Sequence, residues 1–264
     1  MAPKGNKKST KEQLLPAAKN STPQQNNNNN PPNWPPLKPL IPASDLYLET
    51  LLDDQILIIR NLLTSTLSKT YVSFLSSLPL VTTPSRPKKY EAVRVNDRFQ
   101  VHDPIFAEML WSSTALKRLV SEEGGDAGAD GGAGAGLWGG EVLGLNPNIR
   151  IYRYGPGQFF DKHYDDSVPL SIPQTTTTNN ATIRAKTTWT LLIYLTTCTG
   201  GETVFYPETP TKTKSSPQPE PLIVGLEAGM ALLHRHGERC LLHEGREVTG
   251  GEKWVIRSDL VVRR

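Results

Sequence analysis

The sequence predicts an α+β fold in which helices come first and pack outside a β-sandwich or barrel. Apolar residues recur at helical spacing in the first half, whereas short β-rich segments separated by turn residues dominate from residue 146 onward. The chain has 264 residues, 37% of them hydrophobic and 21% charged. That size and composition suit one substantial domain with a hydrophobic core, together with polar tails.

The first 42 residues differ from the rest in composition. They are rich in lysine, asparagine and proline, and residues 1–40 hold six lysines against the single acid Glu12. Because the whole chain carries a net charge of +3, the remainder is close to neutral. A segment this polar buries too little apolar surface to offset the entropy of ordering it. We therefore expect residues 1–42 to be a disordered arm, with a solvated tail favoured over a localisation signal, and residues 43–264 to be the domain.

Helical spacing of apolar residues predicts helical support over residues 43–145. A Gly/Ala/Asp run at residues 124–136 then predicts a flexible surface insertion. The predicted helices are Asp45–Leu63, Thr66–Ser77 and Ala107–Glu122.

The second half, residues 146–264, is expected to form the catalytic β core. Low-complexity segments at 173–186 and 207–221 predict surface loops between strands. The predicted strands are Asn148–Tyr154, Gln158–Tyr164, Thr187–Thr197, Glu202–Tyr206, Met230–Arg235, Cys240–Glu244 and Lys253–Val262.

Several classes of protein are disfavoured by composition. Two cysteines in a chain of this length indicate a reducing compartment. The N-terminus shows no apolar signal segment, and no run approaches the roughly 18 apolar residues of a membrane helix. We expect a cytoplasmic or nuclear protein without a membrane partner. A near-neutral domain also gives no sign of nucleic-acid binding.

Two potential metal ligands lie in one strand-like run, residues 162–165. His163 and Asp165 are two residues apart, so their side chains project to the same face while Tyr164 points away. One imidazole and one carboxylate aimed at a common point are two-thirds of the facial triad of oxygen-activating Fe(II) sites. His243, at the end of a later apolar strand, is the best candidate for the third ligand. Three protein ligands leave three positions open on six-coordinate iron, although the ligand count alone does not exclude zinc.

The surrounding sequence resembles the prolyl 4-hydroxylase-like family of 2-oxoglutarate-dependent dioxygenases. The resemblance begins with residues 154–160 (YGPGQFF) followed by His163-x-Asp165, and its blocks fall in the family's order over about residues 146–264. The later blocks are 190–195 (TLLIYL), 200–205 (GGETVF), 229–233 (GMALL), 243–248 (HEGREV) and Lys253-Trp254-Val255.

The resemblance implies roles for individual residues. His163, Asp165 and His243 would bind Fe(II), and Lys253, ten residues after the distal histidine, would bind the far carboxylate of 2-oxoglutarate. A dicarboxylic cosubstrate needs such a fixed cation away from the metal. Arg257 lies four residues on, on the same strand face, and is the rival anchor. The hydroxyls of Tyr154 and Tyr194 would also contact the oxo acid.

Other polar residues have less specific interpretations. His234 and His236 compete with His243 as the distal ligand, but Lys253 does not lie at the family spacing from either. We therefore expect both histidines to be structural or to support the ligands. His236 is also kept, with Asn96 and Arg98, as a residue of the substrate side.

By the same resemblance, the fold is expected to be a double-stranded β-helix, a jelly-roll type of barrel with supporting N-terminal helices. The expected enzyme uses Fe(II), O2 and 2-oxoglutarate, releases succinate and CO2, and hydroxylates an unactivated C–H bond, with ascorbate as reductant. A prolyl or other residue of a protein or peptide is the expected substrate. The alternatives are an oxidative demethylase of nucleic acid or a small molecule, and a non-catalytic binding protein on the same fold.

Overall fold

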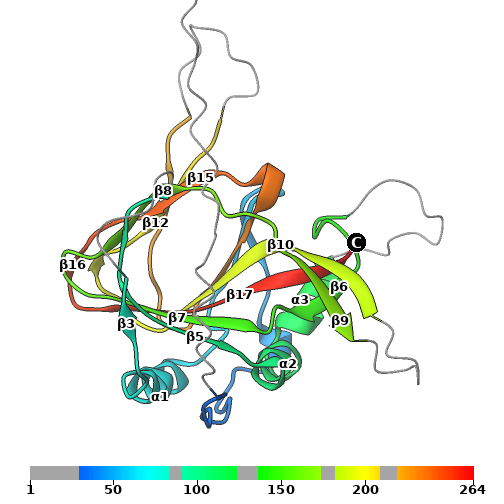
Figure 1. Cartoon of the computed structure of the whole chain (residues 1–264), viewed down its shortest axis with the longest axis horizontal. Coiled ribbons are helices and arrows are strands. Elements are labelled where there is room, and N and C mark those ends of the chain that lie inside the picture. Colours follow the sequence, from blue (N-terminus) through cyan, green and yellow to red (C-terminus); the bar gives the residue numbers. More distant parts are fainter. Residues whose placement is uncertain (1–29, 84–90, 124–135, 174–181, 209–218) are drawn as a thin grey trace, which may run out of the picture.

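The computed structural model describes residues 30–83, 91–123, 136–173, 182–208 and 219–264. Two antiparallel sheets face each other, and three helices lie against the outer side of the larger one (Figure 1). The larger sheet follows the order β1 (Glu49–Leu52), β2 (Ile56–Ile59), β14 (Ala231–Arg235), β10 (Thr182–Tyr194), β17 (Lys253–Arg263), β7 (Asn148–Tyr154), β5 (Asp97–His102) and β3 (Val81–Thr82), with β6 (Val142–Leu145) on β17 and β9 (Pro169–Pro173) on β10.

The smaller sheet supplies the opposite wall. The chain crosses repeatedly between the two sheets, because β7, β10, β14 and β17 belong to the larger sheet and β8, β12, β13 and β15 to the smaller one. This alternation of antiparallel strands is the winding of a jelly roll, so the predicted fold class is confirmed. The smaller sheet has the order β13 (Leu222–Val224), β12 (Thr203–Tyr206), β15 (Leu242–Gly245), β8 (Phe159–His163) and β4 (Arg94–Val95), and β11 (Thr199–Gly200) pairs with β16 (Val248–Gly250).

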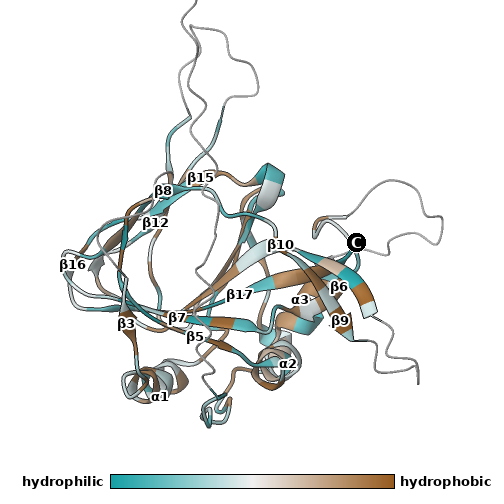
Figure 2. Cartoon of the chain, viewed as in Figure 1, coloured by the Kyte–Doolittle hydropathy of each residue, from teal (hydrophilic) through white to brown (hydrophobic). Residues whose placement is uncertain are grey.

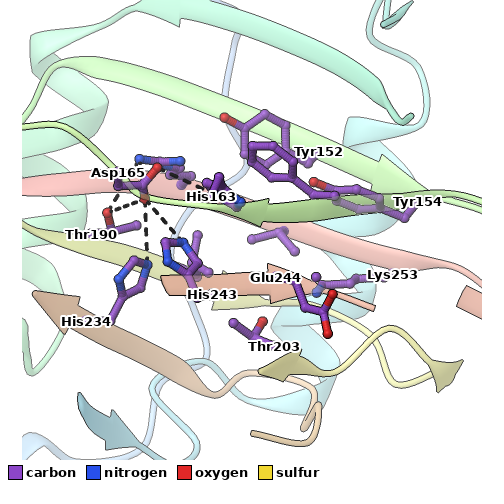
Figure 3. A pocket seen from close by; sticks show the side chains of 15 residues that line it. Tyr152, Tyr154, His163, Asp165, Thr190, Thr203, His234, His243, Glu244 and Lys253 are labelled. Atoms are coloured by element: carbon purple, nitrogen blue, oxygen red, sulfur yellow. Dashed lines mark hydrogen bonds and ion pairs between the residues drawn. The ribbon is translucent and has the colours of Figure 1, made fainter. Parts of the chain in front are cut away.

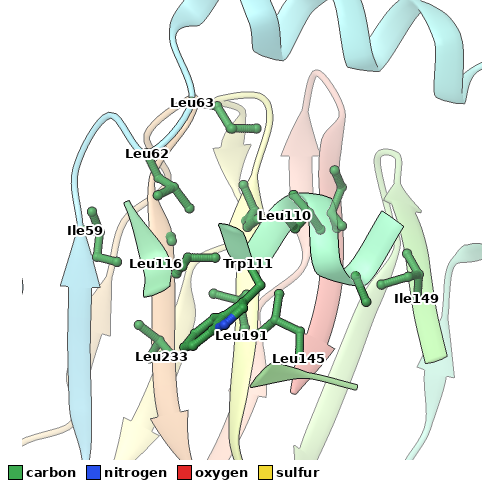
Figure 4. Packing of buried hydrophobic residues seen from close by; sticks show 14 of the residues in the cluster. Ile59, Leu62, Leu63, Leu110, Trp111, Leu116, Leu145, Ile149, Leu191 and Leu233 are labelled. Carbon is green, nitrogen blue, oxygen red and sulfur yellow. The ribbon is translucent and has the colours of Figure 1, made fainter. Parts of the chain in front are cut away.

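Alternating side chains divide the interior into two cores. Hydrophobic and hydrophilic residues alternate along much of β7, whereas β17 is buried over Lys253–Val262, so both strands contribute to the two faces of the larger sheet (Figure 2). The outer face packs on the helices through residues such as Trp111, Leu191 and Leu233 (Figure 4). The inner core lies between the sheets and includes Tyr152, Tyr194 and Phe205.

The first half contains more strand than the sequence predicts. The predicted helix Asp45–Leu63 is wrong: β1 and β2 form a hairpin there, turning at Asp54 with a φ of 56°. All four residues of β2 are buried, because β2 pairs with β14 and continues the larger sheet. A short run buried on both faces gives no periodicity that separates a strand from a helix.

The predicted helices farther along are largely confirmed. Helix α1 spans Ser65–Leu75, close to the prediction, and the N-terminal Thr64 side chain accepts a hydrogen bond from the Leu67 amide. The predicted helix Ala107–Glu122 is interrupted: α2 spans Pro104–Ser113 and α3 spans Leu116–Glu123. The helices are separated at Thr114, whose backbone is extended and whose hydroxyl donates to Leu110 O.

Part of the predicted arm contacts the helices of the domain. Trp34 stacks on Phe106 with ring centroids 3.9 Å apart, and its indole nitrogen donates to Asp103 Oδ2 at 2.7 Å. Leu37 is buried in the outer core, and the Tyr71 hydroxyl donates to Pro35 O. Residues 1–29 and the predicted insertion at 124–135 lie outside the described residues.

Candidate functional site

A pocket opens between the two sheets, with a volume of about 450 Å³ including its mouth. Its walls combine aromatic rings with a cluster of ionisable groups (Figure 3). The ionisable groups lie at two places in the pocket. One is a cluster of histidines around Asp165, and the other, separate from it in Figure 3, is Lys253. The lining residues used below are Tyr152, Tyr154, Phe160, His163, Asp165, Thr190, Thr203, His234, His243, Lys253 and Arg257.

Strand pairing brings the three predicted metal ligands together. His163 ends β8 and lies directly opposite His243 of β15, and Asp165 follows His163 by two residues. His163 Nε2 is 3.8 Å from Asp165 Oδ1, and His243 Nε2 is 3.8 Å from Asp165 Oδ2. One ligand atom from each residue lies within 4.8 Å of the others, and all three side chains are buried. Asp165 thus lies near His163 because it follows two residues later in the chain, and the pairing of β15 with β8 brings His243 to both.

Hydrogen bonds fix the orientation of the two imidazoles. His163 Nδ1 is 2.7 Å from Asp161 O, and His243 Nδ1 is 2.9 Å from Leu241 O. A carbonyl can only accept, so each Nδ1 carries the hydrogen and each Nε2 presents a lone pair toward Asp165. Burial lowers the pKa of both histidines, which favours these neutral rings.

Contacts with Thr190 and Arg257 keep the Asp165 carboxylate ionised. Oδ2 accepts a hydrogen bond from Thr190 Oγ1 at 2.9 Å and forms an ion pair with Arg257 Nη2 at 2.9 Å. Burial alone would raise the pKa of Asp165, but the Arg257 guanidinium holds it well below its usual range. Oδ1 is buried and has no hydrogen-bond partner among the described residues. A buried anionic oxygen facing neutral imidazole lone pairs fits a divalent cation.

Lys253 lies in the same pocket, at the start of β17. Its ammonium donates to Gly201 O at 2.7 Å and faces the rings of Tyr154 and Tyr194 at 5.6 and 5.4 Å. Burial lowers the pKa of Lys253 to about 8. The Tyr194 hydroxyl lies 2.7 Å from Thr203 Oγ1 and forms a hydrogen bond with it. Lys253 has no carboxylate partner among the described residues.

Arg257, the rival anchor, has different neighbours. Besides Asp165, it lies 3.6 Å from Asp259 Oδ1, and its side chain is buried. Asp259 also pairs with Arg150 on β7. Arg257 is therefore committed to two aspartates next to the histidine cluster, which favours Lys253 as the cation available for a ligand.

The predicted substrate-side residues do not line the pocket. Asn96 is fully buried and bonds with Thr83, and Arg98 lies over the Tyr152 ring at 5.9 Å. His236 is behind Asp165, with its ring nitrogens 3.0 Å from Thr190 Oγ1 and 2.9 Å from Thr187 Oγ1. A role in substrate binding stays a prediction for all three.

Sequence reasoning missed the position of His234. This β14 residue is 2% exposed and its Nε2 is 3.8 Å from Asp165 Oδ2, the same separation that His243 has (Figure 3). Its strand belongs to the opposite sheet from His163 and His243, so only the packing of the sheets reveals the proximity. The alternation of His234 and His236 along the chain was the available signal.

The fold and site define a jelly-roll protein with a candidate centre of two histidines and one carboxylate. Residues 149–258 match the family described as the 2OG-Fe(II) oxygenase superfamily, which confirms the resemblance at the level of the superfamily. The superfamily implies Fe(II) and 2-oxoglutarate as metal and cosubstrate. None of the curated proteins matches the chain.

Several solved structures are similar at low sequence identity. The viral collagen prolyl hydroxylase of Paramecium bursaria Chlorella virus-1 is 16% identical with a TM-score of 0.48, covering 79% of this chain and 96% of that one. A Trichoplax adhaerens prolyl hydroxylase, in complex with a hypoxia inducible factor peptide, is 17% identical with a TM-score of 0.49, covering 79% and 84%. A Pseudomonas putida prolyl-4-hydroxylase is 13% identical with a TM-score of 0.49, covering 80% and 94%.

No helix among the described residues is long and apolar enough to span a membrane.

Proposed function

We propose that this protein is an Fe(II)- and 2-oxoglutarate-dependent dioxygenase that hydroxylates an unactivated C–H bond of a prolyl residue in a protein or peptide. One observation carries the proposal: two neutral imidazoles and a carboxylate oxygen without a hydrogen-bond partner converge in the same pocket as a buried lysine that has no carboxylate partner, as far as the described part of the chain goes. The superfamily match supports the cofactors. The motif resemblance supports a prolyl substrate.

The proposed ligands are His163, Asp165 and His243. When bound there, iron supplies oxygen activation coupled to oxidative decarboxylation of 2-oxoglutarate to succinate and CO2. The protein supplies geometry and a shielded pocket. The carbonyls of Asp161 and Leu241 keep the imidazoles oriented, and Thr190 and Arg257 keep Asp165 ionised.

Lys253 would bind the distal carboxylate of the cosubstrate. A buried ammonium needs an anionic partner, and a charge-assisted hydrogen bond to a carboxylate provides one. The rings of Tyr154 and Tyr194 face this ammonium at 5.6 and 5.4 Å. Ascorbate is expected to restore iron that is oxidised in unproductive turnovers.

The test is succinate formation from 2-oxoglutarate with Fe(II), with and without a proline-rich peptide, followed by mass spectrometry of the peptide. We expect His163→Ala, Asp165→Ala and His243→Ala each to abolish succinate formation while circular dichroism stays unchanged. His102→Ala, an exposed imidazole outside the pocket, is the control. A triad variant with near-normal turnover removes that residue from the proposed set. Succinate formation that no peptide stimulates argues against the prolyl substrate but leaves the dioxygenase proposal standing.

A further inference from the structure

A row of arginines crosses the inner face of the larger sheet. In the pairing of β7 with β17, Arg150 lies opposite Arg257, which lines the pocket. In the pairing of β5 with β7, Arg98 lies opposite Tyr152, two residues after Arg150. Residues opposite each other, or two apart on a strand, share a face, and Tyr152 belongs to the inner core. The positive charges therefore extend from the side of Asp165 across the sheet to β5.

The acids next to this row neutralise only part of it. Arg150 and Arg257 are paired with two aspartates, as described above. Arg98 and Arg94, which is on β4, are partly buried and form no ion pair with any residue that the structure describes, although Arg98 donates to the side chain of Gln100. Four guanidinium groups against two carboxylates leave a surplus of positive charge, and partly buried charges favour an anionic partner.

The Tyr152 ring connects the two unpaired arginines with the pocket. The guanidinium groups of Arg94 and Arg98 lie 5.7 and 5.9 Å from its centroid. Arg94 is also 4.9 Å from the centroid of Phe160, and both rings line the pocket. Figure 3 shows the Tyr152 hydroxyl pointing toward the side of the pocket on which Asp165 lies. An anion at this hydroxyl would therefore lie inside the pocket and close to both guanidinium groups.

The Tyr152 hydroxyl is available to a ligand. The residue is 5% exposed, yet its hydroxyl forms no hydrogen bond within the described ranges of the chain. Buried hydroxyls normally have a partner, so one that lines a pocket without a partner is suited to a bound group. The field at this hydroxyl is positive: burial raises the pKa of Tyr152, but the four arginines around it lower that pKa to about 7.

We infer that Tyr152, Arg94 and Arg98 form a subsite for a carboxylate of the substrate, and that the hydroxylated peptide carries an aspartate or glutamate within two residues of its target proline. The inference rests on the proposed function. The phenol donates a hydrogen bond to the carboxylate, and the two guanidinium groups balance its charge. Lys253 lies elsewhere in the pocket, so the carboxylates of substrate and cosubstrate have separate cations.

The test uses the full chain at pH 6.5, at which a Tyr152 phenol with a pKa of about 7 is mostly protonated. Four blocked peptides each carry one proline and one aspartate, placed one or two residues before or after the proline, and four twins carry asparagine instead. Calorimetry on protein loaded with Co(II) and 2-oxoglutarate gives the dissociation constants without turnover. Mass spectrometry of the hydroxylated peptides with Fe(II) gives KM and kcat.

Three variants remove the proposed contacts one at a time. Arg94→Gln and Arg98→Gln each remove a guanidinium group, and Tyr152→Phe removes the hydroxyl. Arg184→Gln, which removes an exposed arginine near the start of β10, is the matched control. Arg98→Lys keeps a positive charge and should restore part of the preference. Each variant is compared on aspartate and asparagine peptides together, so a general loss of folded protein changes both alike.

We expect the wild type to bind at least one aspartate peptide about 10-fold more tightly than its asparagine twin, the ratio that one charged hydrogen bond typically supplies. The preference should appear in KM and not in kcat. It should shrink in the three variants and persist in Arg184→Gln.

Two results would contradict the inference in different ways. Equal binding of the twins at every position, or an unchanged preference in all three variants, overturns the inference and leaves the dioxygenase proposal standing. If no peptide of either kind binds or is hydroxylated while 2-oxoglutarate still binds, the prolyl substrate fails together with the inference.

Discussion

Individual residues set the polarity of the pocket. Asp165 is surrounded by groups that hold it ionised, whereas the histidines near it are kept neutral by burial. Tyr152 shows the strength of the local positive field. Burial alone would raise its pKa, but Arg98, Arg150, Arg257 and Arg94 lower the pKa of Tyr152 to about 7. The proposed metal ligands therefore lie next to several arginines as well as to one another.

Lys253 should make 2-oxoglutarate binding depend on pH. Burial lowers its pKa to about 8, so the free protein loses the anchoring cation as the pH rises through 8. The dissociation constant of 2-oxoglutarate, measured by calorimetry on Co(II)-loaded protein, should be flat below about pH 7 and then rise up to roughly tenfold per pH unit above 8.

The matched variant is Lys253→Met, which keeps most of the apolar stem. It should weaken 2-oxoglutarate binding by about 2–5 kcal/mol, roughly 30- to several-thousand-fold, and should abolish the pH dependence. A wild-type dissociation constant that stays constant from pH 7 to 9.5 contradicts the assigned role. Arg257→Ala is a less clean control, because it also removes a partner of Asp165.

Elements are joined by close backbone contacts, and among the glycines that the structure describes the tightest such contact lies between β13 and β14. Gly229 has a φ of +87°, and a Cβ placed there would lie 1.9 Å from Leu63 O. The Leu63 amide donates to Gly229 O, which ties the segment before α1 to the start of β14. Gly225, in the same connection, has open space around it and an ordinary φ.

Gly229→Ala should therefore destabilise the protein and Gly225→Ala should not. Backbone strain alone costs on the order of 1–3 kcal/mol, and the contact with Leu63 adds to it. Urea unfolding monitored by tryptophan fluorescence provides the free energies. Similar stabilities for the two variants would show that β14 tolerates a shift at its start.

The segment preceding the hairpin is anchored on α2 by Trp34. Its indole stacks on Phe106 and donates to Asp103, the same residue whose other oxygen accepts the Phe106 amide at the start of α2. Trp34→Ala should lower the free energy of unfolding by roughly 2–4 kcal/mol, somewhat less than full removal of a buried aromatic ring.

The exposed neighbour Asn33 provides the comparison, and Asn33→Ala should leave the free energy of unfolding unchanged within about 0.5 kcal/mol. Uncoupled succinate formation should be retained in both variants, because Trp34 packs on the outer side of the larger sheet. An unchanged free energy of unfolding for Trp34→Ala would support a domain boundary near residue 42.

The molecule as a whole buries three neutral histidines around one aspartate, and this arrangement determines its stability in acid. The folded-state pKa values of His163, His234 and His243 are lowered, so below about pH 6.5 the unfolded chain binds more protons than the folded one. Metal-free protein should therefore lose stability as the pH falls below 6.5, by up to about 1.4 kcal/mol per unit for each imidazole.

Urea unfolding in the presence of a chelator, at pH 7.5 and 5.5, measures this loss. His234→Phe should reduce the difference between the two pH values, whereas His102→Gln, at an exposed site, should not. Equal stability of the metal-free wild type at the two pH values would mean that the histidines do not stay neutral in the folded state.

The sequence by itself determined the β-rich half and the core of the site. Strand periodicity predicts that His163 and Asp165 project together, although β8 ends at His163, and β7 has the predicted bounds Asn148–Tyr154. Local patterns of this kind depend on residues that are neighbours along the chain. The motif resemblance supported His243 and added Lys253, because the order and spacing of its blocks can also be read from the sequence.

Only the tertiary structure decided the features that depend on contacts between distant strands. The hairpin β1–β2 is a pair of strands because β14 borders it, not because of its own periodicity. His234 reaches Asp165 because the two sheets face each other, and Arg257 pairs with Asp165 for the same reason. Such contacts depend on sheet order and packing, which the spacing of residues along one strand does not encode.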